Sequence, residues 1–339
     1  MANNKQLRKA RQDKCDEFYT QLSDIESELS HYSDYFRGKV IYCPCDDFSW
    51  SGFPQYFREH FHEIGIKKLV TSCFRSNRRS EKIEYDGKNV TVTPLKGHGD
   101  FRSQECVDLL DRADVIVTNP PFSLFRDFFE LLTSHYKKFV IVGDINAISY
   151  KVVFPSIQNN TVWLGFSRNM SFVIPEHYRR SNNVQRTPNG KALIKLATVR
   201  WYSNVEPKPE RHCREGIPYD PKNYMKMLNF DVICVDKMSE MPRDYYGTMA
   251  VPVSFFDEYN PDEFSILGGT SEFKVDSNGV SQKGILVNPD NGKLKIMGIN
   301  GSDPFIEVSE PPTDRLYILR NGRYYVNPYK RFFVQRIKK

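Results

Sequence analysis

The sequence predicts an α/β fold built on a mainly parallel sheet, followed by a β-rich C-terminal region. Apolar runs typical of buried strands alternate with helical patterns up to about residue 145. Beyond about residue 273, four Asn-Gly pairs at hairpin-like spacing indicate short antiparallel strands. A chain of 339 residues is long enough for one large core and a smaller appended one. We therefore expect two parts, residues 1–204 and residues 205–339.

The first elements are a helix and a strand. Ser23 and Glu26 have the spacing of a capping box, which predicts a helix from there to about residue 36. Residues 39–43 predict the first strand, and Asp46 and Asp47 follow it in a turn. Carboxylates at a strand end can accept hydrogen bonds from ribose hydroxyls or a ligand ammonium group. The turn lacks G-x-G-x-x-G, which argues against NAD or FAD.

A second strand and a hairpin are predicted next. The strand covers residues 68–73, and the hairpin covers residues 81–95 around Asp86-Gly87. The following turn presents Asp100, which could accept from the amine of an adenine-containing cofactor, and Phe101, which could flank its ring. The alternative is that Asp100 caps a helix over residues 103–111, and taken alone this alternative is the stronger one.

The most informative stretch is Thr-Asn-Pro-Pro-Phe at residues 118–122. It follows a predicted buried strand, residues 114–117, and precedes a predicted amphipathic helix with Ser123 as N-cap. It therefore lies at the carboxyl end of a strand, where open α/β sheets bind ligands.

This stretch suits methylation of an exocyclic amine on a nucleobase. The Asn119 side-chain oxygen and the Pro120 carbonyl could each accept one N–H of the amine, which would direct its lone pair at an electrophile. Pro120 and Pro121 fix the backbone, and Phe122 could stack on the base. The electrophile would be the sulfonium methyl of S-adenosylmethionine, and positioning would supply most of the catalysis. The alternative is a proline-rich turn without chemistry.

Later strands are predicted at residues 138–142, 162–165, 172–174 and 197–202, all continuing the same sheet. Between two of them lies a polar segment that contains side chains able to recognise base edges, namely Arg179, Arg180, Asn182 and Asn183. An ordinary polar loop explains the segment equally well. Residues 205–224 are proline-rich and predict a linker or a long loop.

Both ends of the chain are basic, although the whole chain carries a net charge of only +6. Residues 315–339 contain eight cations and no acid, interleaved with aromatic residues. The interleaving predicts a folded β segment that turns Arg331 and Arg336 toward nucleic-acid phosphates. The alternative is a segment that is basic for solubility.

Other site types are less well supported. Cys43, Cys45, His60 and His62 could be arranged as a zinc set, but core cysteines and surface histidines are the better interpretation, so we expect no metal. Seven irregularly spaced cysteines suit reduced thiols in the cytoplasm. No apolar run reaches eighteen residues, and no apolar signal region opens the chain, so we expect no membrane span.

Several motifs in this order resemble the EcoRI-type adenine-specific DNA methyltransferases. The resemblance extends from about residue 13 to about residue 267, and its motifs are residues 16–21, 42–47, 99–103, 118–125, 163–165, 175–178 and 246–252. It implies a Rossmann-like fold. It also implies an activity that depends on S-adenosylmethionine and transfers a methyl group to N6 of an adenine flipped out of double-stranded DNA. It also implies that Phe18, Tyr19 and Thr20 close over the methionine part of the cofactor. Asp46, Asp47, Asp100 and Phe101 would contact the rest of the cofactor, and the motif from Asn119 to Phe122 would be catalytic.

Two departures from the family pattern concern the cofactor. The first loop lacks the glycines common to methyltransferases in general. Ser72-Cys73 stand where many relatives place an acid for the ribose, so Asp46 or Asp47 would have to serve instead.

The predicted function is that of a restriction–modification methylase, acting as a monomer beside a separate endonuclease. RNA adenine methylation and a catalytically silent nucleic-acid-binding module are the alternatives.

Overall fold

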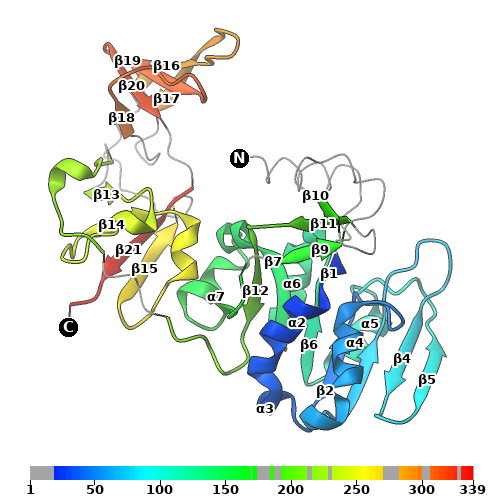
Figure 1. The fold of residues 1–339 in the computed structure, drawn as a ribbon. Coiled ribbons are helices and arrows are strands. Elements are labelled where there is room, and N and C mark those ends of the chain that lie inside the picture. Colours follow the sequence, from blue (N-terminus) through cyan, green and yellow to red (C-terminus); the bar gives the residue numbers. More distant parts are fainter. Residues whose placement is uncertain are drawn as a thin grey trace. The chain divides into compact units, whose positions relative to one another are not determined.

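The computed structural model describes residues 19–168, 170–173, 184–186, 192–211, 216–227, 231–269, 282–299, 306–326 and 330–338. The chain separates into two compact units, Met1–Pro209 and Glu210–Lys339 (Figure 1). The division falls within the proline-rich stretch at residues 205–224. The assignment of cofactor binding and catalysis to residues 1–204, and of target-DNA recognition to residues 205–339, stays a prediction.

The first unit is built on an eight-stranded sheet with the order β5-β4-β3-β2-β6-β7-β12-β8. Its four central strands, β3, β2, β6 and β7, are parallel, and β4 and β12 run against their neighbours. The sheet is therefore mostly parallel, as predicted. The strand bounds are β2 Val40–Cys43, β3 Lys68–Thr71, β4 Glu81–Tyr85, β5 Val90–Pro94, β6 Val115–Thr118, β7 Lys138–Asp144, β8 Trp163–Leu164 and β12 Val199–Ser203.

Helices cover both faces of this sheet, which explains why its central strands are continuous apolar runs. On one face, Ile25 and Phe57 pack into a cluster with the strand residues Ile41, Val115 and Val140. On the other face, the Phe125 ring lies 5.2 Å from that of Tyr202, and the Phe129 ring lies 5.7 Å from that of Phe139. The helices are α2 Leu22–Leu29, α3 Ser33–Phe36, α4 Gly52–Glu59, α5 Gln104–Arg112, α6 Phe125–Ser134 and α7 Phe154–Gln158.

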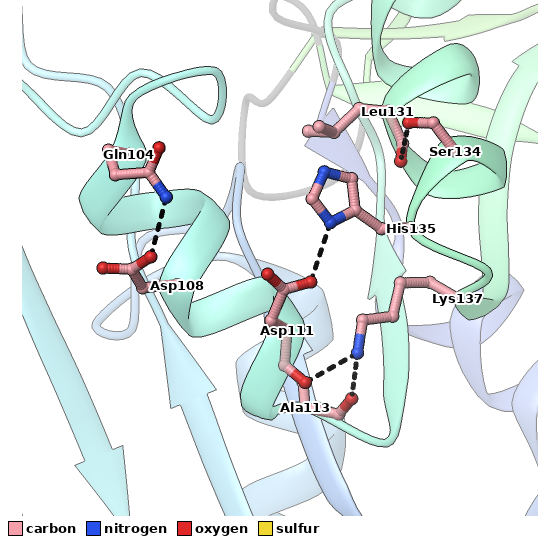
Figure 2. A network of polar contacts seen from close by, with 8 residues as sticks. All are labelled: Gln104, Asp108, Asp111, Ala113, Leu131, Ser134, His135 and Lys137. Atoms are coloured by element: carbon pink, nitrogen blue, oxygen red, sulfur yellow. Dashed lines mark hydrogen bonds and ion pairs between the residues drawn. The ribbon is translucent and has the colours of Figure 1, made fainter.

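A polar network secures the end of the sheet where β7 begins (Figure 2). Lys137 Nζ donates to the carbonyls of Asp111, at 2.8 Å, and Ala113, at 3.0 Å, which lie at the C-terminal end of α5. A cation there satisfies carbonyls that the helix leaves without partners and complements its dipole. His135 Nδ1 lies 2.8 Å from Asp111 Oδ1. These contacts fix α5 against the α6–β7 turn at the amino ends of the strands, opposite the carboxyl ends.

A second, four-stranded sheet in the same unit has the order β1-β9-β11-β10. Its strands are β1 Tyr19–Thr20, β9 Ser171–Val173, β10 Val184–Arg186 and β11 Ala192–Lys195. The prediction that residues 172–174 continue the main sheet is therefore wrong. Residues 172 and 173 pair instead with β1, with Thr20 opposite Phe172, and Asp24 Oδ2 in α2 accepts from the Ser171 N–H at 2.7 Å. Residue 174 lies outside the described residues.

Three predicted caps also differ from the structure. The helix α2 begins at Leu22 with Gln21 as N-cap, so Ser23 lies in its first turn. Ser123 lies in a 3-10 turn, η3 (Phe122–Leu124), in which Leu124 N donates to the Pro121 carbonyl at 2.9 Å, and α6 starts only after it. The N-cap of α5 is Ser103, so Asp100 does not cap that helix.

The second unit is β-rich, as predicted. A four-stranded sheet has the order β13-β14-β21-β15, and a five-stranded sheet has the order β17-β16-β19-β20-β18. Their bounds are β13 Val232–Cys234, β14 Thr248–Val251, β15 Phe264–Gly269, β16 Gln282–Val287, β17 Leu294–Ile299, β18 Ile306–Val308, β19 Tyr317–Arg320, β20 Arg323–Val326 and β21 Phe332–Arg336.

Of the Asn-Gly pairs, which predict tight type I′ turns, Asn321-Gly322 is confirmed, whereas Asn291-Gly292 does not form such a turn. Asn321 and Gly322 both have positive φ, 47° and 74°, and form the two-residue turn between β19 and β20. Asn291-Gly292 lies in a longer loop between β16 and β17. Asn278-Gly279 and Asn300-Gly301 lie outside the described residues. Residues 332–336 form an inner strand, so the basic C-terminal segment is folded there.

No helix in the described part of the chain is long and apolar enough to cross a membrane.

Candidate active site

A cavity of about 310 Å³ lies where the carboxyl ends of β2, β3 and β6 meet. The strand β2 has β3 on one side and β6 on the other, so the strand order reverses direction at this point. Open α/β sheets bind ligands at such a position because the loops after the two neighbouring strands diverge there. The cavity is lined by Thr20, Pro44, Cys45, Asp46, Asp47, Trp50, Ser51, Phe53, Cys73, Phe74, Arg75, Gly99, Asp100, Phe101, Arg102, Asn119, Pro121 and Leu124.

Most residues predicted for the site lie around this cavity. The lining includes Thr20, Asp46, Asp47, Asp100, Phe101, Asn119 and Pro121. Pro120 lies between Asn119 and Pro121, and the backbone of Tyr19 forms β1 with Thr20. Phe18 lies outside the described residues, as do the four predicted base-reading residues Arg179, Arg180, Asn182 and Asn183. The individual roles of these residues stay predictions.

Asp46 joins the loop after β2 to the end of β6. Its Oδ2 accepts from Thr118 Oγ1 at 2.5 Å, and its Oδ1 accepts from Ser51 Oγ. The carboxyl group is buried, and this burial raises its pKa to about 6. The hydrogen bonds from the Ser51 and Thr118 hydroxyls lower the pKa, but their effect is smaller than the increase caused by burial. The position of Asp46 thus depends on the residue directly before Asn119.

Asp47 and Asp100 are each bound by an arginine of the cavity wall. Arg75 Nη2 donates to Asp47 Oδ2, and the Ser49 N–H donates to Asp47 Oδ1 at 2.8 Å. Arg102 binds both oxygens of Asp100, through Nε at 3.0 Å and Nη2 at 2.7 Å. The hydrogen bond from Arg102 lowers the pKa of Asp100. The Asp100 carboxylate therefore remains a charged acceptor at neutral pH, and the two arginines hold both aspartates in place.

Asn119 is held by a residue far from it in sequence. Its Nδ2 donates to Thr20 Oγ1 at 3.2 Å, so the strand β1 reaches the end of β6. The Asn119 Oδ1 atom is buried. The contact places a residue expected to bind the cofactor beside the residue expected to bind the target amine.

Phe122 is buried in the described structure. Its exposed fraction is 3 %, and its ring lies edge-on to that of Phe172 in β9, with 6.4 Å between centroids. Both rings belong to the core cluster on one face of the main sheet. A base can stack on Phe122 only after the ring separates from this packing.

Several cavity residues were not predicted from the sequence. Arg75 and Arg102 bind the two aspartates, and Ser51 binds Asp46. The rings of Trp50 and Phe74 are large, line the cavity and are 54 % and 60 % exposed. The only signal for Phe74 and Arg75 was their place immediately after the second strand.

The four residues weighed as a zinc set lie in different settings. Cys43 is buried in β2, His60 Nδ1 lies 2.8 Å from Glu63 Oε2, and His62 Nε2 lies 3.1 Å from the Gly87 carbonyl. Among the described residues, no group of three or more His, Cys, Asp or Glu side chains is placed to hold a metal ion.

The two C-terminal arginines predicted to contact DNA have partners within their own unit. Arg331 Nη2 donates to Asp236 Oδ1 at 2.6 Å, and the arginine side chain is 12 % exposed. Arg336 lies 4.5 Å from the centre of the Phe264 ring, and its Nη1 is 3.9 Å from Glu263 Oε2. Each arginine therefore has partners in the protein that account for its position. The contacts of both arginines with DNA stay a prediction.

Comparison with known proteins gives consistent matches. The family model described as "Adenine-specific methyltransferase EcoRI" matches residues 6–308. Type II methyltransferase M.EcoRI of Escherichia coli is 38 % identical over 315 residues, which cover 85 % of this chain and 94 % of the relative. Type II methyltransferases M.MgeORF184P of Mycoplasma genitalium and M.MpnI of Mycoplasma pneumoniae are 37 % and 34 % identical, each over 76 % of this chain and 84 % of the relative. No solved structure matches the chain significantly.

Proposed function

Because the chain belongs to the family of EcoRI-type adenine-specific methyltransferases, as its motifs predicted, we propose that it methylates N6 of adenine in duplex DNA. The observation that carries this proposal is the position of residues 118–122. They follow β6 at the reversal of strand order and share one cavity with the loops after β2 and β3. We further propose that the three-layer unit is a Rossmann-like methyltransferase fold.

The side chains around the cavity fit S-adenosylmethionine. This cofactor has ribose hydroxyls and an ammonium group that require acceptors, and an adenine ring that requires an apolar surface. Asp46, Asp47 and Asp100 supply carboxylates, and Phe101 supplies an aromatic ring. The cofactor has no phosphate, which agrees with the absence of a G-x-G-x-x-G loop. When bound, it supplies a methyl group activated by a sulfonium sulfur.

This placement supports the following proposed roles for the protein residues. Asp46 and Asp47 bind ribose or ammonium groups, while Asp100 and Phe101 hold the adenine of the cofactor. Phe18, Tyr19 and Thr20 cover the methionine part, because β1 ends beside the cavity.

The catalytic residues act on the target amine. The Asn119 amide oxygen and the Pro120 carbonyl each accept one of its N–H groups, so that its lone pair is directed at the methyl group. Pro120 and Pro121 remove backbone flexibility at the point where this alignment matters. The rate enhancement comes from positioning and hydrogen bonding, without a strong base.

Access of the target adenine requires a local rearrangement. A paired adenine cannot place its amine against residues 119–122, so the base must leave the duplex. Phe122 is 3 % exposed and packed against Phe172, so the incoming base must displace one of these rings. The gain from stacking, roughly 1 to 3 kcal/mol per base, offsets part of that cost.

The relatives are named Type II methyltransferases, and we propose that this protein likewise protects DNA from a separate restriction endonuclease. Arg179, Arg180, Asn182 and Asn183 are proposed to read bases, and Arg331 and Arg336 to contact phosphates.

Incubation with methyl-labelled S-adenosylmethionine tests the proposal. Duplex DNA, single-stranded DNA and RNA of the same sequence are offered in parallel, and methylated nucleosides are identified by mass spectrometry. We expect N6-methyladenine in duplex DNA. Label confined to RNA, or no label in any substrate, would contradict the proposal.

A further inference from the structure

The orientation of the Asn119 side chain decides whether it can serve the reaction. An asparagine amide has an acceptor oxygen and a donor nitrogen on the same carbon. If the nitrogen faced the target amine, two N–H donors would meet and the amine would lose an acceptor. Some group must therefore hold the nitrogen away from the target.

Thr20 is the group that contacts this nitrogen. Asn119 Nδ2 donates to Thr20 Oγ1 at 3.2 Å across 99 residues of sequence. Because the nitrogen is turned toward Thr20, the amide oxygen lies on the opposite side of the amide group. A threonine hydroxyl is a suitable acceptor because it carries two lone pairs.

Thr20 is itself fixed from three directions. It pairs with Phe172 in the antiparallel β1–β9 contact, and α2 begins only two residues later. On a third side lies Gly52, where an added Cβ would lie 3.1 Å from the Thr20 carbonyl and 2.7 Å from a carbon of Ile25. Strand pairing, the first turn of α2 and the close approach of α4 thus leave Thr20 little freedom to move.

The segment opposite Thr20 is tied to α2 along one helical face. Asp24 and Glu28 accept from backbone N–H groups of Ser171 and Ser167, at 2.7 and 2.6 Å. In the 3-10 turn η1 (Ser30–Tyr32), directly after α2, the His31 ring stacks on that of Phe166 with 3.9 Å between centroids. Because β9 also carries Phe172 against Phe122, the small sheet contacts both ends of the catalytic motif.

We propose that Thr20 is a positioning residue for Asn119: its hydroxyl holds the amide nitrogen so that the amide oxygen faces the target amine. This inference rests on the proposed function and gives Thr20 a role distinct from the cofactor contact that the family resemblance implies.

Two variants at position 20 separate the possibilities. Thr20→Val keeps the shape and the strand preference but removes the acceptor, while Thr20→Ser keeps the hydroxyl. With saturating cofactor and duplex DNA, we expect Thr20→Val to lower kcat by roughly three- to tenfold, which is the usual range for one hydrogen bond. Thr20→Ser should restore most of kcat. Because Thr20 is also proposed to cover part of the cofactor, cofactor Kd is measured by titration calorimetry, and its change in Thr20→Val should be much smaller than the change in kcat. Tm should stay close to the wild-type value in both variants.

A second measurement does not depend on methyl transfer. The side-chain amide signals of Asn119 are assigned in an ¹H–¹⁵N spectrum of the full chain by their loss in Asn119→Ala. They should shift in Thr20→Val and stay near the wild-type position in Thr20→Ser. This result holds even if the wild-type protein methylates a different substrate, so failure of the proposed function is distinguishable from failure of this inference.

Three outcomes would overturn the inference: an unchanged kcat in Thr20→Val, a cofactor Kd that rises in proportion to the loss of kcat, or Asn119 amide signals that do not respond to Thr20→Val.

Discussion

The hydroxyl of Thr118 donates a 2.5 Å hydrogen bond to Asp46 Oδ2. The bond joins the loop after β2, where the cofactor is proposed to bind, to the residue directly before Asn119. The bond thus connects two loops that are 72 residues apart in sequence. The proposed cofactor site and the proposed base site are thus joined by a hydrogen bond to the buried carboxyl group of Asp46.

That carboxylate gives the protein a characteristic pH dependence. Its pKa is about 6 in the folded chain, against 3.8 for the exposed group. The folded state therefore holds the proton more tightly, and the stability associated with this proton is lost as the pH rises from about 4 through 6. Asp46→Asn removes the titration. The free energy of unfolding of the variant, relative to wild type, should rise by roughly 2 to 3 kcal/mol between pH 4 and pH 7.5.

Urea unfolding of both proteins at several pH values measures this difference. Asp24 and Glu28 also have pKa values raised by burial, but they are present in both proteins and cancel. A constant difference across the pH range would show that Asp46 does not titrate as described.

Phe122→Leu should weaken retention of the target base while leaving the fold largely intact. Leucine keeps much of the buried volume against Phe172 but cannot stack on a base, which is worth roughly 1 to 3 kcal/mol. Fluorescence of 2-aminopurine at the target position should rise less than with the wild type. The matched control, Phe172→Leu, loosens the same packing and keeps the stacking ring. An enhancement equal to wild type in Phe122→Leu would exclude Phe122 as the platform.

Arg331→Gln should lower the stability of the second unit. The guanidinium is mostly buried and pairs with Asp236 at 2.6 Å, so its loss leaves that carboxylate without a close cation and should cost roughly 1 to 3 kcal/mol. Arg323→Gln is the control, because its ion pair with Glu307 is exposed and such pairs contribute about 0 to 1 kcal/mol. Thermal unfolding measures both, and an equal Tm for Arg331→Gln and wild type would contradict the structural role.

The same variant tests the proposed phosphate contact. If Arg331 also reaches a phosphate, the slope of log affinity against log salt should fall by about one unit. A stability loss with an unchanged slope would assign Arg331 to the fold alone.

Asn119→Ala should abolish methyl transfer and leave cofactor binding intact. The residue is proposed to touch the amine of the base, and loss of one positioned hydrogen-bond partner costs roughly 2 to 4 kcal/mol of transition-state stabilisation. Single-turnover assays measure the rate, and calorimetry measures cofactor affinity. Equal turnover in the variant and the wild type would remove Asn119 from the mechanism.

The parts of the fold and site that the sequence predicts correctly are those determined by residues close together in the chain. The buried strands were visible as apolar runs, and Asp46, Asp47, Asp100 and Asn119 were visible because they follow strand ends. In a parallel sheet the carboxyl ends meet at one edge, so residues with this placement converge without further information. The two positive φ angles at Asn321 and Gly322 likewise follow from residue type.

The parts that were missed depend on tertiary contacts. Arg75 binds Asp47 across 28 residues, and Phe122 is buried by Phe172 from a strand 50 residues later. A three-residue apolar run such as residues 172–174 does not specify which sheet it joins. Ser23 and Ser123 had the sequence context of N-caps, but α2 already begins at Leu22, and the local 3-10 turn at Phe122–Leu124 delays the start of α6 to Phe125.

The central claim is that the protein methylates adenine in duplex DNA and that residues 118–122 position the target amine. The most direct measurement is nucleoside mass spectrometry, with methylation mapping, of DNA from a host without its own adenine methylases that expresses either the wild type or Asn119→Ala. We predict N6-methyladenine at one recurring sequence with the wild type and none with the variant. Host DNA without N6-methyladenine despite folded wild-type protein, or equal methylation by Asn119→Ala, would contradict the account.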